Sequence, residues 1–166
     1  IQKSAFCRKE CEYLGYWITR NGIKPLNKKV EAINNIATPT TKKQLQSFIG
    51  MVNYYRDMWQ GRSDLLAPLS ALTSKKTKWL WTDVHQASFD SMKKAIARET
   101  ILAYPDFNKP FDIHNDGSKV QQGAVISQEN RPIAFYSWKL TDTQTRYTTM
   151  KRELLSIVKI LEEFQT

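Results

Sequence analysis

The spacing of apolar positions changes twice along the chain, from two-residue steps to helical steps and back again. Residues 12–24 alternate in two-residue steps and contain Asn21-Gly22, the dipeptide most typical of a tight hairpin turn. The alternation predicts a β-hairpin that ends at Pro25. Its two faces would carry Leu14, Tyr16 and Ile18 on one side, and Tyr13, Trp17 and Thr19 on the other.

Four helices are predicted next, because apolar residues recur at steps of three and four. Asn27 is a candidate cap for the first helix, Thr40 and Thr41 begin the second, and Thr82 can cap the fourth. Pro68 predicts a late start or a break in the third. The apolar stripes are, in chain order, Val30, Ile33 and Ile36 or Ala37; Leu45, Phe48, Ile49, Val52, Tyr55 and Trp59; Leu65, Leu66, Leu69 and Leu72; and Phe89, Met92 and Ile96.

Gly50 lies in the middle of the second predicted helix. A glycine at such a position costs about 1 kcal/mol relative to alanine. We expect another helix or a stretch of backbone to approach closely here, since that would explain the missing side chain.

Three strands and a long helix are predicted in the last third of the chain. The strands are 111–116, 122–127 and 132–137, and the last two are joined by a turn at about QENR, so an antiparallel meander is expected. The helix would begin at about Thr145. Its inward stripe would consist of Met150, Leu154, Ile157, Val158, Leu161 and Phe164.

Together these elements predict an α+β fold in three parts. A hairpin would occupy residues 1–26, a helical unit residues 27–98, and the meander with its helix residues 99–166. Pro105 and Pro110 mark the boundary between the second and third parts.

The excess of positive charge is confined to the first half of the chain. Residues 1–80 hold 14 Lys and Arg against 5 Asp and Glu, whereas residues 81–166 hold 11 of each kind. From charge alone, a solvated basic face and a polyanion-binding surface are equally good interpretations. If several of these side chains neutralise phosphates, binding should weaken steeply with salt.

Export and membrane insertion have no support in the sequence. No stretch approaches the roughly 18 uninterrupted apolar residues that a membrane span needs, and the N-terminus has no apolar signal core. Cys7 and Cys11 are the only cysteines, and His85 and His114 lie far along the chain, so reduced thiols are favoured over a zinc site. We expect an intracellular protein, in the cytoplasm or nucleus, with no membrane partner.

Acidic residues in the last third could hold a divalent metal ion. Asp112, His114 and Asp116 share one face of the first strand of the meander, and Asp116 ends that strand. Glu153 flanks the apolar stripe of the final helix and can point at the sheet. Two such carboxylates could share Mg²⁺ with water and substrate oxygens. The spacing alone favours a plainer interpretation, an acid in a turn and an acid on a solvated helix face.

Several stretches, in the same order, resemble one family. LAYPDFNKPFDIHNDGS, followed by GAVISQ, RPIAFYS and RYTTMKRELLSIV, resembles the opening of the ribonuclease H domain in gypsy-type long-terminal-repeat retrotransposons. Upstream, EYLGYWITRNGIKP is similar to the family's primer-grip hairpin, and FIGMVNYYRDM and LLAPLSALTSKK resemble its helical thumb and connection. The pattern W-T-x-x-x-x-x-x-F at 81–89 matches the link into ribonuclease H. The resemblance covers essentially the whole chain.

The resemblance implies a fragment of a retroelement polyprotein with RNA-directed DNA polymerase and RNA–DNA hybrid ribonuclease activity. Asp116 and Glu153 match the first two acids of the family's ribonuclease H site, so the resemblance makes them catalytic residues and ligands of Mg²⁺ or Mn²⁺. Two further Asp would lie beyond Thr166, and the polymerase carboxylates before Ile1. We therefore expect a truncated ribonuclease H-like part, and no ribonuclease activity from the isolated 166-residue chain.

The resemblance also implies contacts with nucleic acid. Leu14, Gly15 and Tyr16 fall in the primer-grip-like hairpin, where Gly15 would let the backbone approach primer phosphates. The plainer interpretation is a small residue in a strand. The candidate phosphate contacts of the thumb helices are Lys42, Lys43 and Arg56. The partners would be RNA–DNA hybrid, duplex nucleic acid and the remainder of the polyprotein.

Some positions depart from the family pattern. Asp116 lies between Asn115 and Gly117 where Thr-Asp-Ala is usual, and Lys151 replaces a common Glu, but neither change removes a metal ligand. These departures leave open a domesticated, non-catalytic nucleic-acid-binding or scaffolding protein. A protein–protein module unrelated to nucleic acid is a third alternative, and its binding would be insensitive to salt.

Overall fold

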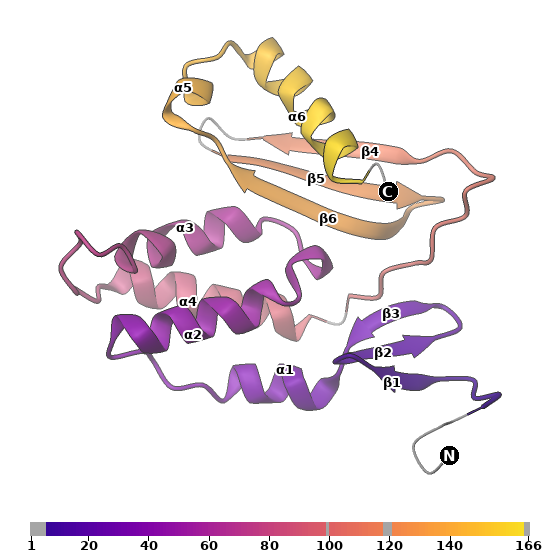
Figure 1. The fold of residues 1–166 in the computed structure, drawn as a ribbon, viewed down its shortest axis with the longest axis horizontal. Helices are drawn as coiled ribbons and strands as arrows, with labels where there is room; N and C mark the ends of the chain where they lie inside the picture. Colours follow the sequence, from indigo (N-terminus) through magenta and orange to yellow (C-terminus); the bar gives the residue numbers. More distant parts are fainter. Residues whose placement is uncertain (1–5, 99, 118–120, 165–166) are drawn as a thin grey trace.

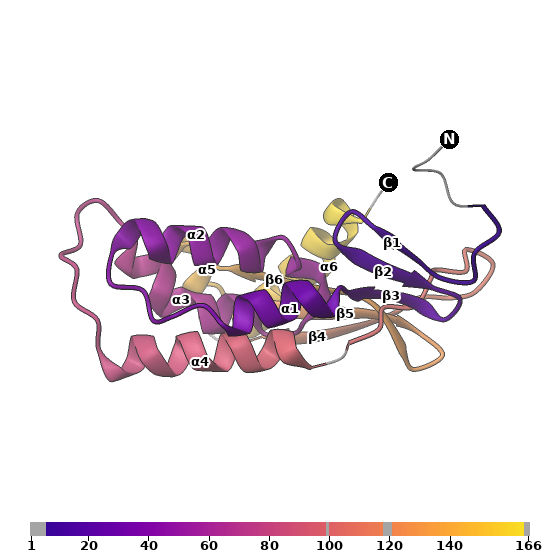
Figure 2. The same cartoon turned by 90° about the horizontal axis from the view of Figure 1, so that it is seen from below.

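The computed structural model describes residues 6–98, 100–117 and 121–164, and of Asp116 and Gly117 the backbone alone. Within this part of the chain, a helical unit and a small antiparallel sheet lie side by side beneath a second antiparallel sheet (Figure 1, Figure 2). The second sheet carries the last long helix on its far face (Figure 1). The α+β fold predicted from the sequence is confirmed.

The first sheet has three strands, where a two-stranded hairpin was predicted. The chain turns first at Leu14 and Gly15, whose φ angles of 45° and 82° are both positive, as a two-residue hairpin turn of type I′ requires. Leu14 therefore lies in a turn and not on a strand face. The strands are β1 (Cys11–Tyr13), β2 (Tyr16–Thr19) and β3 (Gly22–Pro25), in that order across the sheet.

The second turn lies one residue earlier than predicted. Thr19 pairs with Gly22, so Arg20 and Asn21 form the turn and Gly22 already belongs to β3. Gly22 has a φ of 144°, and a Cβ built on it would lie 2.1 Å from the carbonyl oxygen of Leu102. This glycine is therefore required by the close approach of a distant segment.

That segment pairs with β3 through two backbone hydrogen bonds. The amide of Ile23 donates to the carbonyl of Leu102 at 2.8 Å, and the amide of Leu102 donates to Ile23 at 2.9 Å. The chain thus returns to the first sheet after it has completed the helical unit.

The helical unit follows the predicted apolar stripes closely. Its elements are α1 (Asn27–Asn34), α2 (Lys42–Asn53), the short 3-10 helix η1 (Arg56–Met58), α3 (Arg62–Leu72) and α4 (Asp83–Ala97). They enclose one core, in which the most deeply buried side chains include Leu45, Phe48, Val52, Leu69, Phe89 and Met92. Burial of such aliphatic and aromatic side chains is the main stabilising contribution.

Several helix ends differ from the prediction. Leu26, and not Asn27, occupies the N-cap position of α1, and no side chain caps that helix. The Thr41 hydroxyl does cap α2, where it accepts a hydrogen bond from the amide of Gln44. Pro68 lies inside a continuous α3, so neither the predicted late start nor the break occurs.

The predicted meander is confirmed, with strands β4 (Asp112–Gly117), β5 (Gln121–Gln128) and β6 (Arg131–Lys139). Glu129 and Asn130 join β5 to β6, with φ angles of 51° and 61°. The predicted long helix is α6 (Thr149–Glu163), which begins a few residues after the expected start at about Thr145, and a short helix that was not predicted, α5 (Asp142–Thr145), precedes it.

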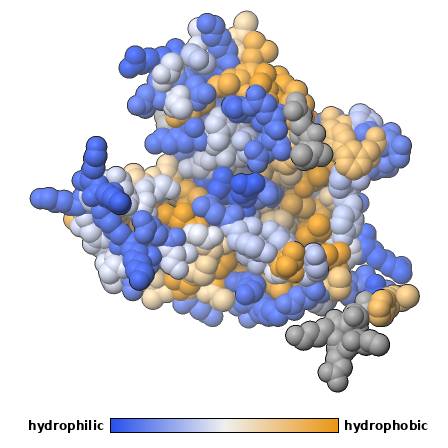
Figure 3. Space-filling model, in the orientation of Figure 1, coloured by the Kyte–Doolittle hydropathy of each residue, from blue (hydrophilic) through white to orange (hydrophobic). Residues whose placement is uncertain are grey.

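The prediction for the inward stripe of α6 is wrong. Ser156 and Ile160 are the buried residues of this helix, and they face β4 and β5. Most of the apolar stripe lies away from the sheet, where Figure 3 shows hydrophobic atoms over α6, and Phe164 at its end meets the Tyr136 ring of β6 edge-on. Every one of its members is exposed: Met150, Leu154, Ile157, Val158, Leu161 and Phe164.

The second sheet is joined to the helical unit by a polar contact. Arg62 donates to the side-chain oxygen of Asn53 at 2.7 Å and to the carbonyl of Ser137 on β6 at 3.2 Å. Ser63 donates its amide to the Ser137 hydroxyl. None of the helices in the described ranges is long and apolar enough to cross a membrane.

Candidate nucleic-acid interface

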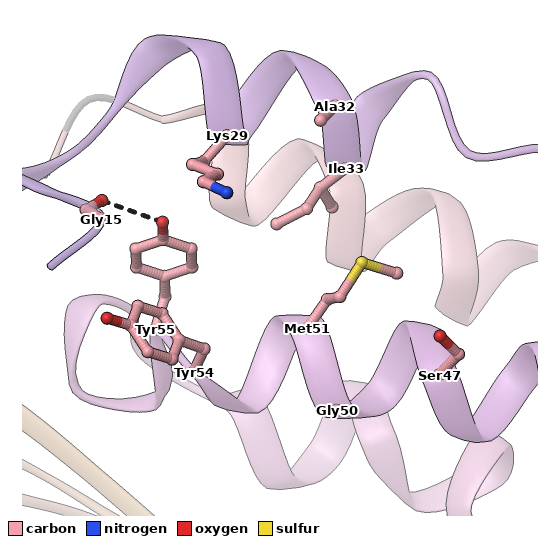
Figure 4. A pocket seen from close by; sticks show the side chains of 9 residues that line it. All are labelled: Gly15, Lys29, Ala32, Ile33, Ser47, Gly50, Met51, Tyr54 and Tyr55. Carbon is pink, nitrogen blue, oxygen red and sulfur yellow. Dashed lines mark hydrogen bonds between the residues drawn. The ribbon is translucent and has the colours of Figure 1, made fainter.

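Two tyrosines from the end of α2 hold the first turn of the small sheet. The Tyr54 hydroxyl donates to the carbonyl of Leu14, and the Tyr55 hydroxyl donates to the carbonyl of Gly15 at 3.0 Å (Figure 4). The Gly15 carbonyl also accepts from the amide of Leu26 at 3.2 Å. Both carbonyls of the turn are therefore engaged, while the Leu14 side chain is 67% exposed to solvent. The plainer interpretation of Gly15, a small residue in a strand, is wrong.

A third tyrosine completes this cluster. The Tyr16 ring stacks on Tyr54 with centroids 5.6 Å apart and meets Tyr55 edge-on at 5.3 Å. Its hydroxyl donates to the Tyr54 carbonyl at 3.0 Å. Burial, and then the neighbouring tyrosines, raise the pKa of Tyr16 to about 12, and burial likewise raises the pKa of Tyr55. Both hydroxyls therefore remain protonated hydrogen-bond donors near neutral pH.

An open groove of about 600 Å³ lies beside this turn, between α1 and α2. In Figure 4, Ile33 from α1 and Met51 from α2 point toward one another across it, and Lys29 extends into it. The lining residues are Gly15, Lys29, Ala32, Ile33, Ser47, Gly50, Met51, Tyr54 and Tyr55.

Gly50 has a different role from the one predicted. No heavy atom lies within 4 Å of the place where its Cβ would be, so no helix or backbone packs against it. The expectation of a close intramolecular approach is wrong. The missing side chain instead leaves the wall of the groove open at the middle of α2.

The basic residues predicted to contact phosphates lie in three different settings. The Lys42 ammonium donates to the carbonyl of Ser74 at 2.5 Å and to that of Thr77, so it organises the loop between α3 and α4. Arg56 belongs to η1, where it pairs with Asp57 at 3.4 Å and Glu163 at 3.3 Å. Lys43 is exposed and makes no ion pair with any residue that the structure describes.

The loop that Lys42 organises is itself basic. Lys75, Lys76 and Lys78 are exposed on it, and none is ion-paired within the described ranges. Figure 3 shows hydrophilic side chains gathered at this end of the molecule, at the left of the view. This loop and the neighbouring Lys43 at the start of α2 therefore present positive charge that no described residue pairs with.

The two candidate metal ligands lie on neighbouring elements. The backbone of Asp116 pairs with Gly123 near the end of β4, and its carboxylate is outside the described side chains. Glu153 is exposed on α6, and its spacing to Ser156 and Ile160 puts it on the helix side that faces the sheet. The two residues thus lie on elements that contact each other. That they share a metal ion stays a prediction. Asp112 and His114 are exposed on β4, and the described residues hold no group of three metal-binding side chains.

Sequence reasoning missed most of the groove. Lys29, Ser47 and Met51 carry no local signal, because only the packing of α1 beside α2 brings them together. Gly50 was the one local signal of the groove, because a glycine inside a helix lowers its stability and is therefore unusual there. The prediction was that another segment of the protein itself packs against Gly50.

Comparison with known proteins gives a consistent result. Residues 81–166 match the family described as "RNase H-like domain found in reverse transcriptase". The chain is 36% identical, over 99% of its length, to the retrovirus-related Pol polyprotein from transposon 297 of Drosophila melanogaster. It is 29% identical, over 98% of its length, to the transposon Tf2-3 polyprotein of Schizosaccharomyces pombe. The alignments cover 16% and 13% of these relatives, so the chain spans less than a fifth of their length.

Solved structures of similar fold contain bound nucleic acid. A foamy viral protease-reverse transcriptase in complex with RNA/DNA hybrid superimposes with a TM-score of 0.86, at 27% identity, over 98% of this chain and 23% of that one. The same viral protein in complex with dsDNA gives a TM-score of 0.85, at 27% identity, over 98% of this chain and 35% of that one.

Proposed function

The chain belongs to the family of RNase H-like domains found in reverse transcriptases, and we propose that it serves within a retroelement polyprotein to hold a primer–template duplex. Its parts would be a primer-grip-like hairpin at 1–26, a helical thumb and connection at 27–98, and the beginning of a ribonuclease H-like domain at 99–166. The similarity to a reverse transcriptase bound to RNA/DNA hybrid supports this assignment.

The observation that carries the proposal is the open groove at Gly50. A helix that lacks a side chain at this point lets the sugar edge of a duplex approach its backbone, whereas an alanine or larger residue would hold it away. Lys29 lies at the same groove and could neutralise a phosphate. Contacts of this kind recognise duplex shape and backbone without reading sequence.

Within the ribonuclease H-like part, Asp116 and Glu153 would hold Mg²⁺ or Mn²⁺. Carboxylates are the donors that both ions prefer, so the two residues fit such an ion. A bound ion would activate water toward the RNA phosphodiester and stabilise the leaving oxygen. The isolated chain should not cleave a hybrid, because two carboxylates are fewer than the four acids that the family resemblance implies.

The groove is tested by binding to a fluorescent RNA–DNA hybrid, followed by anisotropy. Gly50→Leu should fill the groove and weaken binding by a factor of ten or more, whereas Gln46→Leu, an exposed position of α2 outside the groove, should bind like the wild type. Equal affinities for the two variants would remove the groove from the interface.

Salt titration of the same complex tests the charge contact. Lys29→Ala should lower the slope of log affinity against log salt by about 1, as expected for one lost phosphate contact. The exposed Lys94 of α4 supplies the matched control, since Lys94→Ala should leave the slope unchanged.

Cleavage is tested with the hybrid and Mg²⁺ or Mn²⁺. We expect no cleavage by the isolated chain. Robust cleavage that Asp116→Asn abolishes would show that the chain already holds a complete site.

A further inference from the structure

We propose that Tyr54 and Tyr55 are positioning residues that fix the Leu14–Gly15 turn relative to the groove, so that Leu14 meets one sugar of a bound strand at a defined register. This inference rests on the proposed function, since it concerns how the duplex in the groove is aligned. Tyr54 and Tyr55 would act through the turn, and Leu14 would make the contact.

The turn is conformationally demanding. Leu14 has a φ of 45°, a region that residues with a side chain rarely adopt, and Gly15 follows with 82°. The strand before the turn, β1, has three residues, and all three are exposed. A strand this short and exposed stabilises the turn only weakly, so contacts from another segment must stabilise it.

The two tyrosines at the end of α2 make those contacts. The hydroxyls of Tyr54 and Tyr55 donate to the two successive carbonyls of the turn, those of Leu14 and Gly15. A Cβ added to Gly15 would lie 3.2 Å from the Tyr54 ring and 3.3 Å from the Tyr55 hydroxyl, so the fit is tight. Tyr55 is itself 4% exposed, which fixes its own position in the core.

The same helix forms one wall of the groove. Gly50 and Met51 lie in the last turn of α2, Tyr54 is the C-cap residue of that helix and Tyr55 follows it, and all four residues line the groove together with Gly15. Tyr54 directly follows the last residue of α2, and the Tyr55 amide donates to the Val52 carbonyl at 3.1 Å, so the two hydroxyl contacts set the offset between the groove and the turn. A duplex that lies against Gly50 would therefore meet Leu14 at a fixed number of nucleotides from its contact with Gly50.

Leu14 has the chemistry of a sugar contact. Its side chain is apolar and 67% exposed at the tip of the turn, and it carries no charge that could bind a phosphate. The deoxyribose or ribose face is the apolar part of a nucleic-acid backbone. Contacts to it would align a strand without reading its sequence.

Hydrogen–deuterium exchange tests the hold on the turn in the free chain. In a Tyr54→Phe/Tyr55→Phe variant, the backbone amides of residues 13–16 should exchange about fivefold faster for each lost hydrogen bond. Tyr104→Phe is the matched control, because the Tyr104 hydroxyl donates to Thr19 at the other end of the same sheet. That control should change exchange near residues 19–22 only. Unchanged exchange at 13–16 in the double variant would overturn the proposal.

Site-directed crosslinking tests the register. A photoactivatable group would be attached to Leu14→Cys, with the exposed Cys7 and Cys11 both replaced by Ser, and the chain bound to an end-labelled hybrid. With both tyrosines present, crosslinking should occur mainly at one nucleotide. In the Tyr54→Phe/Tyr55→Phe background it should spread over several neighbouring nucleotides, although the thermal unfolding midpoint stays close to that of the wild type.

The outcomes separate this inference from the proposed function. Identical crosslink positions in the two backgrounds, or a bound hybrid that never crosslinks from position 14, would overturn the positioning role and leave duplex binding standing. Absence of binding in the anisotropy measurement would overturn the proposed function and the inference together.

Discussion

At the scale of the residue, Gly22 leaves less room for a side chain than Gly15, Gly50 or Gly61 does. A Cβ there would lie 2.1 Å from the Leu102 carbonyl oxygen and 2.9 Å from a side-chain carbon of Ile101. We predict that Gly22→Ala lowers the free energy of unfolding by about 1–3 kcal/mol, because it adds backbone strain and breaks the Ile23–Leu102 pairing. Urea denaturation measures this change.

Gly50, unlike Gly22, has free space around the position of a Cβ atom. Its surroundings are empty and it lies inside a helix, so Gly50→Ala should raise the free energy of unfolding by about 0.5–1 kcal/mol. A loss of stability in the same urea titration would mean that the groove is narrower than described.

Tyr16 should make the stability of the chain depend on alkaline pH. Its pKa is raised to about 12 in the folded chain, chiefly by burial, against about 10 when unfolded. The folded state therefore holds a proton that the unfolded state has lost between pH 10 and 12, and stability falls as pH rises through this window. Denaturation midpoints at pH 8, 10, 11 and 12 should decline less steeply in Tyr16→Phe. Equal declines would assign the effect to other groups.

Sequence reasoning could not identify contact partners that lie far away in the sequence. Gly22 was assigned to a turn because Asn-Gly is a strong local signal, yet its conformation is set by Leu102, far away in the sequence. The family resemblance made Lys42 a candidate phosphate contact, which stays a prediction, but no local pattern indicated the loop carbonyls that its ammonium contacts. Local patterns contain no information about such partners.

At the scale of the element, prediction worked where one face of a helix or strand meets a core. The apolar stripes of α2, α3 and α4 are buried as their periodicity indicates, and the three strands of the meander lie within two residues of their predicted ends. The prediction failed for α6, since periodicity identifies an apolar face but not what that face packs against. Asp116 and Glu153 are on the predicted elements, and their convergence stays a prediction.

The outer face of α6 should make the chain associate at high concentration. Leu154 and Leu161 are 59% and 50% exposed and belong to a contiguous apolar stripe, which is the kind of surface that drives association. Sedimentation velocity should show a sedimentation coefficient that rises with concentration. Leu154→Lys/Leu161→Lys should remove most of the increase, whereas Val84→Lys, at an exposed apolar position on α4, should not. Concentration-independent sedimentation of the wild type would contradict this prediction.

At the scale of the whole molecule, Arg62 joins the helical unit to the second sheet. Its guanidinium contacts both the Asn53 side chain and the Ser137 carbonyl, and burial lowers the pKa of Arg62 from its ordinary value. Arg62→Ala should cost about 1–3 kcal/mol of unfolding free energy, because it leaves half-buried acceptors unpaired. Calorimetry should show the single transition broaden or split. Arg146→Ala, at an exposed position, is the control and should leave the transition intact.

The pairing of Ile23 with Leu102 also bears on how the chain responds to a cut. It closes a loop of about 80 residues whose two ends lie side by side, and the entropy needed to close a flexible loop rises only slowly with its length. The helical unit thus begins and ends at two segments that pair with each other. A chain cut by limited proteolysis in the basic loop at 74–78 should therefore remain one folded molecule, because the cut lies between Ile23 and Leu102 and their pairing holds the two pieces together.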